Sequence, residues 1–247
     1  MISILTSSPT KEITPACPLP ALDERNGFID FLKEIWKQPS RCLMIAAFPD
    51  AYDRNDEMTW FYGQAVNNAG LETVCFDLWD DRRAPMTRQQ LHGYDAVFLA
   101  GGHVPTEARW FEEIGLQDLL EGYEGIVLGT SAGSMNMAST VYGWPEEPGE
   151  SCDPNHRLFF SGLGLARTIV LPHYQKIRDN WLDGRRLMED ITCSHSFGQR
   201  FYAIPDGSYV LAKDGEERLF GEAWLVSEGT ITKFCSLGQQ RLLSGKD

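Results

Sequence analysis

One serine of the chain stands in a pattern that suits a nucleophile. Residues 129–133 read G-T-S-A-G and follow a short apolar run at 126–128, which is the G-x-S-x-G pattern of a nucleophile elbow. In such an elbow the serine sits on a strained turn between a strand and a helix, and its small neighbours let chain and substrate approach. The first N–H groups of the helix face any negative charge that develops. Glycine-rich turns often carry the same pattern, so Ser131 needs partners elsewhere.

A serine nucleophile needs a base, and His173 is the best placed of the five histidines. It comes directly after an apolar strand-like run, 169–171, and after Pro172, which fixes the approach of the chain. His103 follows Gly102 and is predicted to contact a substrate. A loop histidine with a purely structural role is an equally good interpretation. The other histidines, His92, His156 and His195, lie in polar or loop-like stretches.

The third member of a triad is a carboxylate that orients the imidazole. An acidic loop, 145–153, lies between Ser131 and His173 in the sequence. Four of its residues qualify: Glu146, Glu147, Glu150 and Asp153. Most of them must be solvated, and the chain order would be serine, acid, histidine.

The elements that must position these residues alternate between strand and helix. Strands are predicted at 2–6, 41–47, 73–77, 96–100 and 126–128, and helices at 27–37, 56–69, 87–91 and 106–120. This alternation is typical of an α/β fold with a doubly wound, mostly parallel sheet and helices on both faces. Ligands of such sheets bind beyond the carboxyl ends of the strands. Gly101-Gly102 and the Ser131 elbow both follow strands, so backbone N–H groups from the two would form an oxyanion hole if the strands are neighbours.

The last third of the sequence is richer in β-structure. We expect a strand at 169–171, a helix at 179–191, and short strands at 200–204, 209–212, 222–226 and 231–234. Asp206-Gly207 and Asp214-Gly215 are hairpin signals between these strands. No linker or repeat divides the chain, so the sequence predicts one domain, 1–247, with a β-rich C-terminal extension of the sheet.

Composition excludes several classes of protein. The 22 Lys and Arg residues against 35 Asp and Glu give a net charge of −13, which argues against nucleic-acid or anionic-membrane binding. No signal peptide and no apolar run long enough for a membrane span are visible. The six cysteines are scattered without a C-x-x-C pair, as expected of a reduced cytoplasmic protein. The sequence leaves a homodimer open.

The motifs together resemble the peptidase E family. Gly101-Gly102 closes a strand, the G-T-S-A-G elbow follows, and S-G-L-G-L at 161–165 leads to L-P-H-Y at 171–174. This family includes aspartyl dipeptidase and cyanophycinase and has the class I glutamine-amidotransferase-like fold. The resemblance covers about residues 1–235. It implies a serine hydrolase, dipeptidase-like and acting on small peptides, that needs no metal and no cofactor.

The resemblance also assigns roles by position. Ser131 corresponds to the nucleophile and His173 to the base, and Gly102 and Ala132 correspond to the residues whose N–H groups form the oxyanion hole. Glu146 matches the acid of aspartyl dipeptidase best, whereas Glu150 lies nearer the position in cyanophycinase.

The resemblance says less about how a substrate is recognised. The aspartyl dipeptidases hold an acidic N-terminal residue with an arginine after the histidine, and Arg185 or Arg186 is nearest in position. A plain helix face that pairs with Glu189 and Asp190 is an equal alternative. The family's Gly-Gly-Asn-Thr is Gly-Gly-His-Val at 101–104 here, which puts the family's substrate in doubt.

Two other functions remain. An esterase or amidase of the α/β-hydrolase kind would place its histidine late in the chain, where only His195 stands, and it would carry an HGGG-type motif that this sequence lacks. A non-catalytic binding protein could keep the fold, and a wide gap between Ser131 and His173 would favour it.

Overall fold

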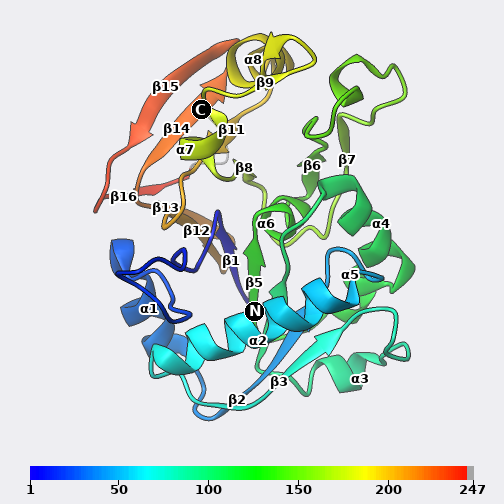
Figure 1. The fold of residues 1–247 in the computed structure, drawn as a ribbon, viewed down its shortest axis with the longest axis vertical. Coiled ribbons are helices and arrows are strands. Elements are labelled where there is room, and N and C mark those ends of the chain that lie inside the picture. Colours follow the sequence, from blue (N-terminus) through cyan, green and yellow to red (C-terminus); the bar gives the residue numbers. More distant parts are fainter. Residues whose placement is uncertain (244–247) are drawn as a thin grey trace.

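An eight-stranded sheet forms the centre of the structure, a computed structural model that describes residues 1–243 (Figure 1). Its strands lie in the order β16-β13-β12-β1-β5-β4-β2-β3. The five from β1 to β3 pair in parallel, whereas β12, β13 and β16 join through antiparallel pairs. In chain order the strands are β1 Ile2–Thr6, β2 Ser40–Ile45, β3 Thr73–Trp79, β4 Ala96–Leu99, β5 Ile126–Thr130, β12 Tyr209–Lys213, β13 Glu216–Phe220 and β16 Gln240–Leu242.

Helices cover both faces of this sheet, because successive side chains of a strand point to opposite sides. Leu43 and Ile45 of β2 belong to the same apolar layer as side chains of α4, Val104–Glu113, and α5, Leu116–Leu119. Cys42 and Met44 belong to the other layer, with α1, Phe28–Ile35, and α2, Tyr52–Asn68. The continuous apolar run of β2 is therefore explained by burial on both sides.

A second, four-stranded sheet stands over one end of the main sheet (Figure 1). Its order is β15-β14-β11-β8, with β8 Ile169–Leu171, β11 Phe201–Ala203, β14 Ala223–Ser227 and β15 Thr230–Cys235. β8 and β11 are parallel neighbours, and Leu171 pairs with Ala203 at their carboxyl ends. The C-terminal strands thus divide between the two sheets.

The remaining elements are short. They are the helices α3 Arg88–Leu91, α6 Ala132–Asn136, α7 Tyr174–Ile177 and α8 Cys193–His195, the 3-10 helices Arg25–Gly27 and Glu150–Cys152, the π-helix Leu187–Thr192, and the paired strands β6 Thr140–Tyr142 with β7 Phe159–Ser161 and β9 Trp181–Leu182 with β10 Arg185–Arg186. Among residues 1–243 no helix is long and apolar enough to cross a membrane. Residues 244–247 of the predicted domain lie outside the described residues.

Two predicted helices differ from the structure. The helix predicted at 179–191 is wrong over its first part, where β9 and β10 form a hairpin, because Asp183 and Gly184 both adopt positive φ, at 50° and 77°, as a tight hairpin turn requires. Only residues 187–191 of the predicted range are helical, as part of the π-helix. The helix predicted at 106–120 is divided into α4 and α5 by Gly115, whose φ is 63°.

Of the two predicted hairpin turns, one is confirmed. Asp214-Gly215 joins the antiparallel strands β12 and β13. Asp206-Gly207 instead connects β11 of the second sheet to β12 of the main sheet.

Candidate active site

Ser131 occupies a strained turn between β5 and α6. Its backbone adopts φ 52° and ψ −116°, a region that costs a non-glycine residue about 1–3 kcal/mol unless its surroundings impose it. Here the Ser131 N–H donates to the carbonyl oxygens of Thr6 and Ser7, each at 3.1 Å. The side chain is left partly exposed at the carboxyl end of the central strand.

The glycines of the elbow are there because other backbone comes close. A Cβ on Gly133 would lie 2.5 Å from the carbonyl oxygen of Leu99, and one on Gly129 would lie 2.6 Å from the nitrogen of Ser134. Gly101 approaches the nucleophile itself, since a Cβ there would lie 3.2 Å from the Cβ of Ser131. β4 and β5 are parallel neighbours, so Gly101-Gly102 and Ser131 lie at adjacent strand ends.

The second sheet supplies the base. His173 follows β8 and adopts a left-handed conformation with φ 59° and ψ 31°. This conformation turns the ring toward the elbow, where its Nε2 lies 3.0 Å from Ser131 Oγ. The distance allows the Ser131 hydroxyl to donate to an unprotonated Nε2.

The other ring nitrogen of His173 contacts Asp206. Its Nδ1 lies 2.7 Å from Asp206 Oδ1, and Asp206 follows β11, the parallel neighbour of β8. Burial alone would raise the pKa of Asp206, but the hydrogen bond and charge of His173 and the hydroxyl of Ser7 outweigh it and hold that pKa well below its ordinary value. An ionised Asp206 selects the tautomer of His173 that carries a proton on Nδ1.

Comparison with known proteins identifies the family. The sequence matches peptidase family S51 over residues 25–220. The chain belongs to this family. It is therefore a serine peptidase. A comparison with curated protein sequences gives no match.

Solved structures of two peptidases share the fold of this S51 peptidase. A peptidase from an acI-B1 Actinobacterium superposes with a TM-score of 0.64 at 15% identity, covering 98% of this chain and 96% of that one. A protein of Listeria monocytogenes EGD-e assigned to peptidase E gives a TM-score of 0.52 at 14% identity, covering 98% of each chain. At these identities the likeness concerns the fold alone.

The prediction that Glu146 orients the base is corrected by the structure. The ring nitrogens of His173 face Ser131 and Asp206, so neither is left for a carboxylate of loop 145–153. Glu146 is exposed. The three residues that these contacts join follow the order serine, histidine, aspartate along the chain, whereas the sequence predicted serine, acid, histidine.

The acidic loop has other partners. Glu150 Oε2 accepts from the N–H groups of Glu146 and Glu147, at 2.8 and 2.9 Å, and its Oε1 lies 3.0 Å from His103 Nε2. Burial tends to raise the pKa of Glu150, but these N–H groups and His103 lower it overall. His103 also bonds Thr106 through Nδ1 at 2.8 Å, so both of its ring nitrogens are engaged.

Neither predicted substrate arginine is free of other contacts. Arg185 is partly buried and donates through Nη2 to the carbonyl oxygen of Ser151 at 2.7 Å, which ties the β9–β10 hairpin to loop 145–153. Arg186 forms an exposed ion pair with Asp190 at 2.6 Å. For Arg186, the structure shows the alternative interpretation, a surface ion pair with Asp190.

Sequence reasoning missed Asp206 although a signal was present. The sequence predicts only a turn at Asp206-Gly207, and a turn is present: Gly207 has φ 85°, and a Cβ there would collide with the Arg25 guanidinium at 2.6 Å. The rule that ligands bind beyond the carboxyl ends of parallel strands would also have pointed to Asp206. Applying it required knowing that β11 lies beside β8.

Proposed function

We propose that this S51 peptidase hydrolyses small peptides through a triad of Ser131, His173 and Asp206. One observation carries the proposal: a continuous chain of contacts runs from Ser131 Oγ to His173 Nε2 at 3.0 Å and from His173 Nδ1 to Asp206 Oδ1 at 2.7 Å. Both distances are within hydrogen-bond reach. A non-catalytic protein on this fold would have no need to keep them.

In the proposed reaction His173 works first as a base. Its Nε2 takes the proton of Ser131 Oγ while Oγ attacks the peptide carbonyl, and Asp206 stabilises the imidazolium that forms. The imidazolium then gives that proton to the leaving amine, which leaves an acyl group on Ser131. Water attacks the acyl group with the same base, and the free acid leaves.

The oxyanion would be stabilised by the N–H groups of Gly102 and Ala132. Two observations support this assignment. The strands β4 and β5 are adjacent, and Gly101 packs against Ser131. Removing one such donor costs about 2.7–4 kcal/mol in known hydrolases.

We propose a dipeptide-sized substrate, as in the peptidase E family. The contacts that His103, Arg185 and Arg186 already make weaken the proposals that His103 binds the substrate and that either arginine binds an acidic N-terminal residue. All six cysteines lie within the described residues and are free, which supports work in a reducing compartment such as the cytoplasm.

An activity-based probe tests this function. We expect a fluorophosphonate to label Ser131 covalently, and we expect Ser131→Ala to abolish both labelling and the release of amino acids from a dipeptide library. Ser139→Ala is a matched control, because Ser139 is exposed and, among residues 1–243, its hydroxyl bonds only the carbonyl oxygen of Ala166, at 3.1 Å. Dipeptide turnover that persists in Ser131→Ala would rule the proposal out.

A further inference from the structure

Ser7 contacts every member of the proposed triad. It follows β1 directly and is fully buried. Its carbonyl oxygen accepts from the Ser131 N–H at 3.1 Å, and its Oγ accepts from the His173 N–H at 2.7 Å. The hydroxyl proton goes to Asp206 Oδ1 at 2.6 Å. One residue thus links the nucleophile in the main sheet to the base and acid in the second sheet.

The Ser7 hydroxyl addresses two geometric demands of the site. His173 is a non-glycine residue in the left-handed region, which persists only where neighbouring groups impose it, and the bond from its N–H to Ser7 Oγ is such a constraint. The same hydroxyl fixes the oxygen of Asp206 that accepts from His173 Nδ1.

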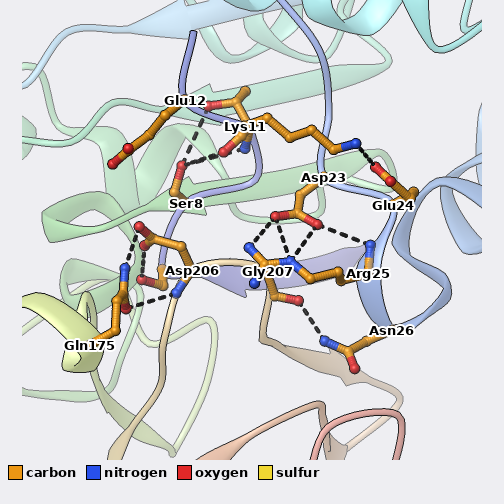
Figure 2. Close-up of polar contacts among 12 residues, drawn as sticks. Ser8, Lys11, Glu12, Asp23, Glu24, Arg25, Asn26, Gln175, Asp206 and Gly207 are labelled. Atoms are coloured by element: carbon orange, nitrogen blue, oxygen red, sulfur yellow. Dashed lines mark hydrogen bonds and ion pairs between the residues drawn. The ribbon is translucent and has the colours of Figure 1, made fainter. Parts of the chain in front are cut away.

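The second oxygen of Asp206 is held by Gln175 (Figure 2). Gln175 Nε2 donates to Asp206 Oδ2 at 2.5 Å, and the Asp206 N–H donates to Gln175 Oε1 at 3.1 Å. Lys176 Nζ lies 3.5 Å from the same Oδ2. The carboxylate therefore has one orientation, with Oδ1 turned to Ser7 and His173.

We propose that Ser7 is a positioning residue of this peptidase, which locks the ring of His173 and the carboxylate of Asp206 onto Ser131. The proposal rests on the proposed function. Ser7 touches no reacting atom in this scheme, and it acts through the residues that do. A site held this way is already aligned for attack before a substrate binds, which is where the rate advantage of preorganisation arises.

The test compares Ser7→Ala with Ser8→Ala. Ser8 is the adjacent residue, and its hydroxyl bonds Thr10 and none of the triad. We expect Ser7→Ala to lower kcat and the rate of fluorophosphonate labelling roughly 100-fold, with KM little changed, because a small misplacement of a reacting group has an effect of this size. Ser8→Ala should keep the wild-type rates. Circular dichroism and thermal melts establish that both variants fold.

A spectroscopic signal separates this proposal from the proposed function. In protein carrying ¹⁵N-histidine, the Nδ1 proton of His173 should give a resonance that disappears in His173→Gln and that shifts or broadens in Ser7→Ala but not in Ser8→Ala. Wild-type labelling and an unchanged resonance in Ser7→Ala, together with unchanged kcat, would overturn the positioning role alone. Failure of the wild type to label would refute the proposed function, while the resonance would still decide what Ser7 does.

Discussion

The two halves of the proposed active site are built in different ways. The nucleophile half lies inside the main sheet, where β5 is flanked by β1 and β4 and the elbow is enclosed by backbone. Ser134, fully buried, donates through Oγ to the Thr6 carbonyl at 2.7 Å and accepts from the Thr6 N–H at 2.8 Å. Close backbone packing around the elbow, together with this one buried hydroxyl, therefore holds the geometry of Ser131.

The base–acid half lies at the ends of β8 and β11 and depends on side-chain hydrogen bonds. The side chains of His173 and Asp206 are 31% and 15% exposed, and Gln175, which holds Asp206, is exposed. The proposed nucleophile is thus fixed mainly by steric exclusion, whereas the proposed base and acid are fixed by a small number of polar contacts. Apart from Ser131 itself, substitutions in the first half should mainly change folding, and those in the second should mainly change catalysis.

The largest effect is expected at Asp206. Asp206→Asn should lower kcat roughly 10⁴-fold, because an asparagine amide can donate to Nδ1 and select the tautomer whose Nε2 carries a proton and cannot accept from Ser131. Initial rates on the best dipeptide, or fluorophosphonate labelling rates, measure this.

Glu146→Gln is the matched control for that substitution. It removes a carboxylate that does not contact the ring nitrogens of His173, so the kcat of this variant should stay near the wild-type value. A large loss of kcat in Glu146→Gln with little loss in Asp206→Asn would show that the carboxylate of the triad lies in loop 145–153. It would also contradict the division of the site into two halves.

A smaller catalytic effect and a larger effect on folding are expected at Gly133. Gly133→Ala adds a Cβ 2.5 Å from the Leu99 carbonyl oxygen and 2.7 Å from that of Ala100, and overpacking of this kind destabilises by about 1–3 kcal/mol. Urea unfolding measures the change. Gly63→Ala in α2 is the control, since its Cβ would meet Phe76 at an ordinary 3.4 Å, and alanine suits a helix better than glycine. Equal stability of the two variants would show that the elbow is not sterically fixed.

The same difference explains what sequence alone could predict. The elbow is a local pattern, since Gly129, Ser131 and Gly133 are neighbours in the chain and their roles follow from one turn. The strand–helix alternation from β1 to β5 is likewise carried by local periodicity. His173 could be placed because it follows a strand directly.

Asp206 could not be identified in this way because its role depends on pairing between distant segments. β8 and β11 are separated by a hairpin and a π-helix, and their parallel pairing is what brings His173 and Asp206 together. The choice of Glu146 relied on chain order, which differs here. Ser7 shows the same limit, since nothing in the sequence around it indicates a contact with residues 131, 173 and 206.

The smallest effect tests the packing behind the nucleophile. Glu107 of α4 is fully buried and accepts from Asn136 Nδ2 of α6 at 2.9 Å. Burial raises the pKa of Glu107 well above its ordinary value, so the group is protonated in the folded state under conditions in which it is ionised in the unfolded chain. Its contribution to stability is complete below the unfolded pKa of about 4.3 and is lost as the pH rises toward the folded pKa, by at most about 1.4 kcal/mol per pH unit.

Glu107→Gln should remove that pH dependence and keep the acceptor for Asn136. Its urea midpoint should exceed that of the wild type at pH 8, and the difference should shrink as the pH approaches 4, while kcat stays unchanged because the elbow is held by backbone. Glu113→Gln on the same helix, at an exposed position, should leave the wild-type pH dependence intact. If Glu107→Gln instead lowered kcat without lowering the free energy of unfolding, the position of Ser131 would depend on the polar contact between Glu107 and Asn136. That result would contradict the difference drawn between the two halves of the site.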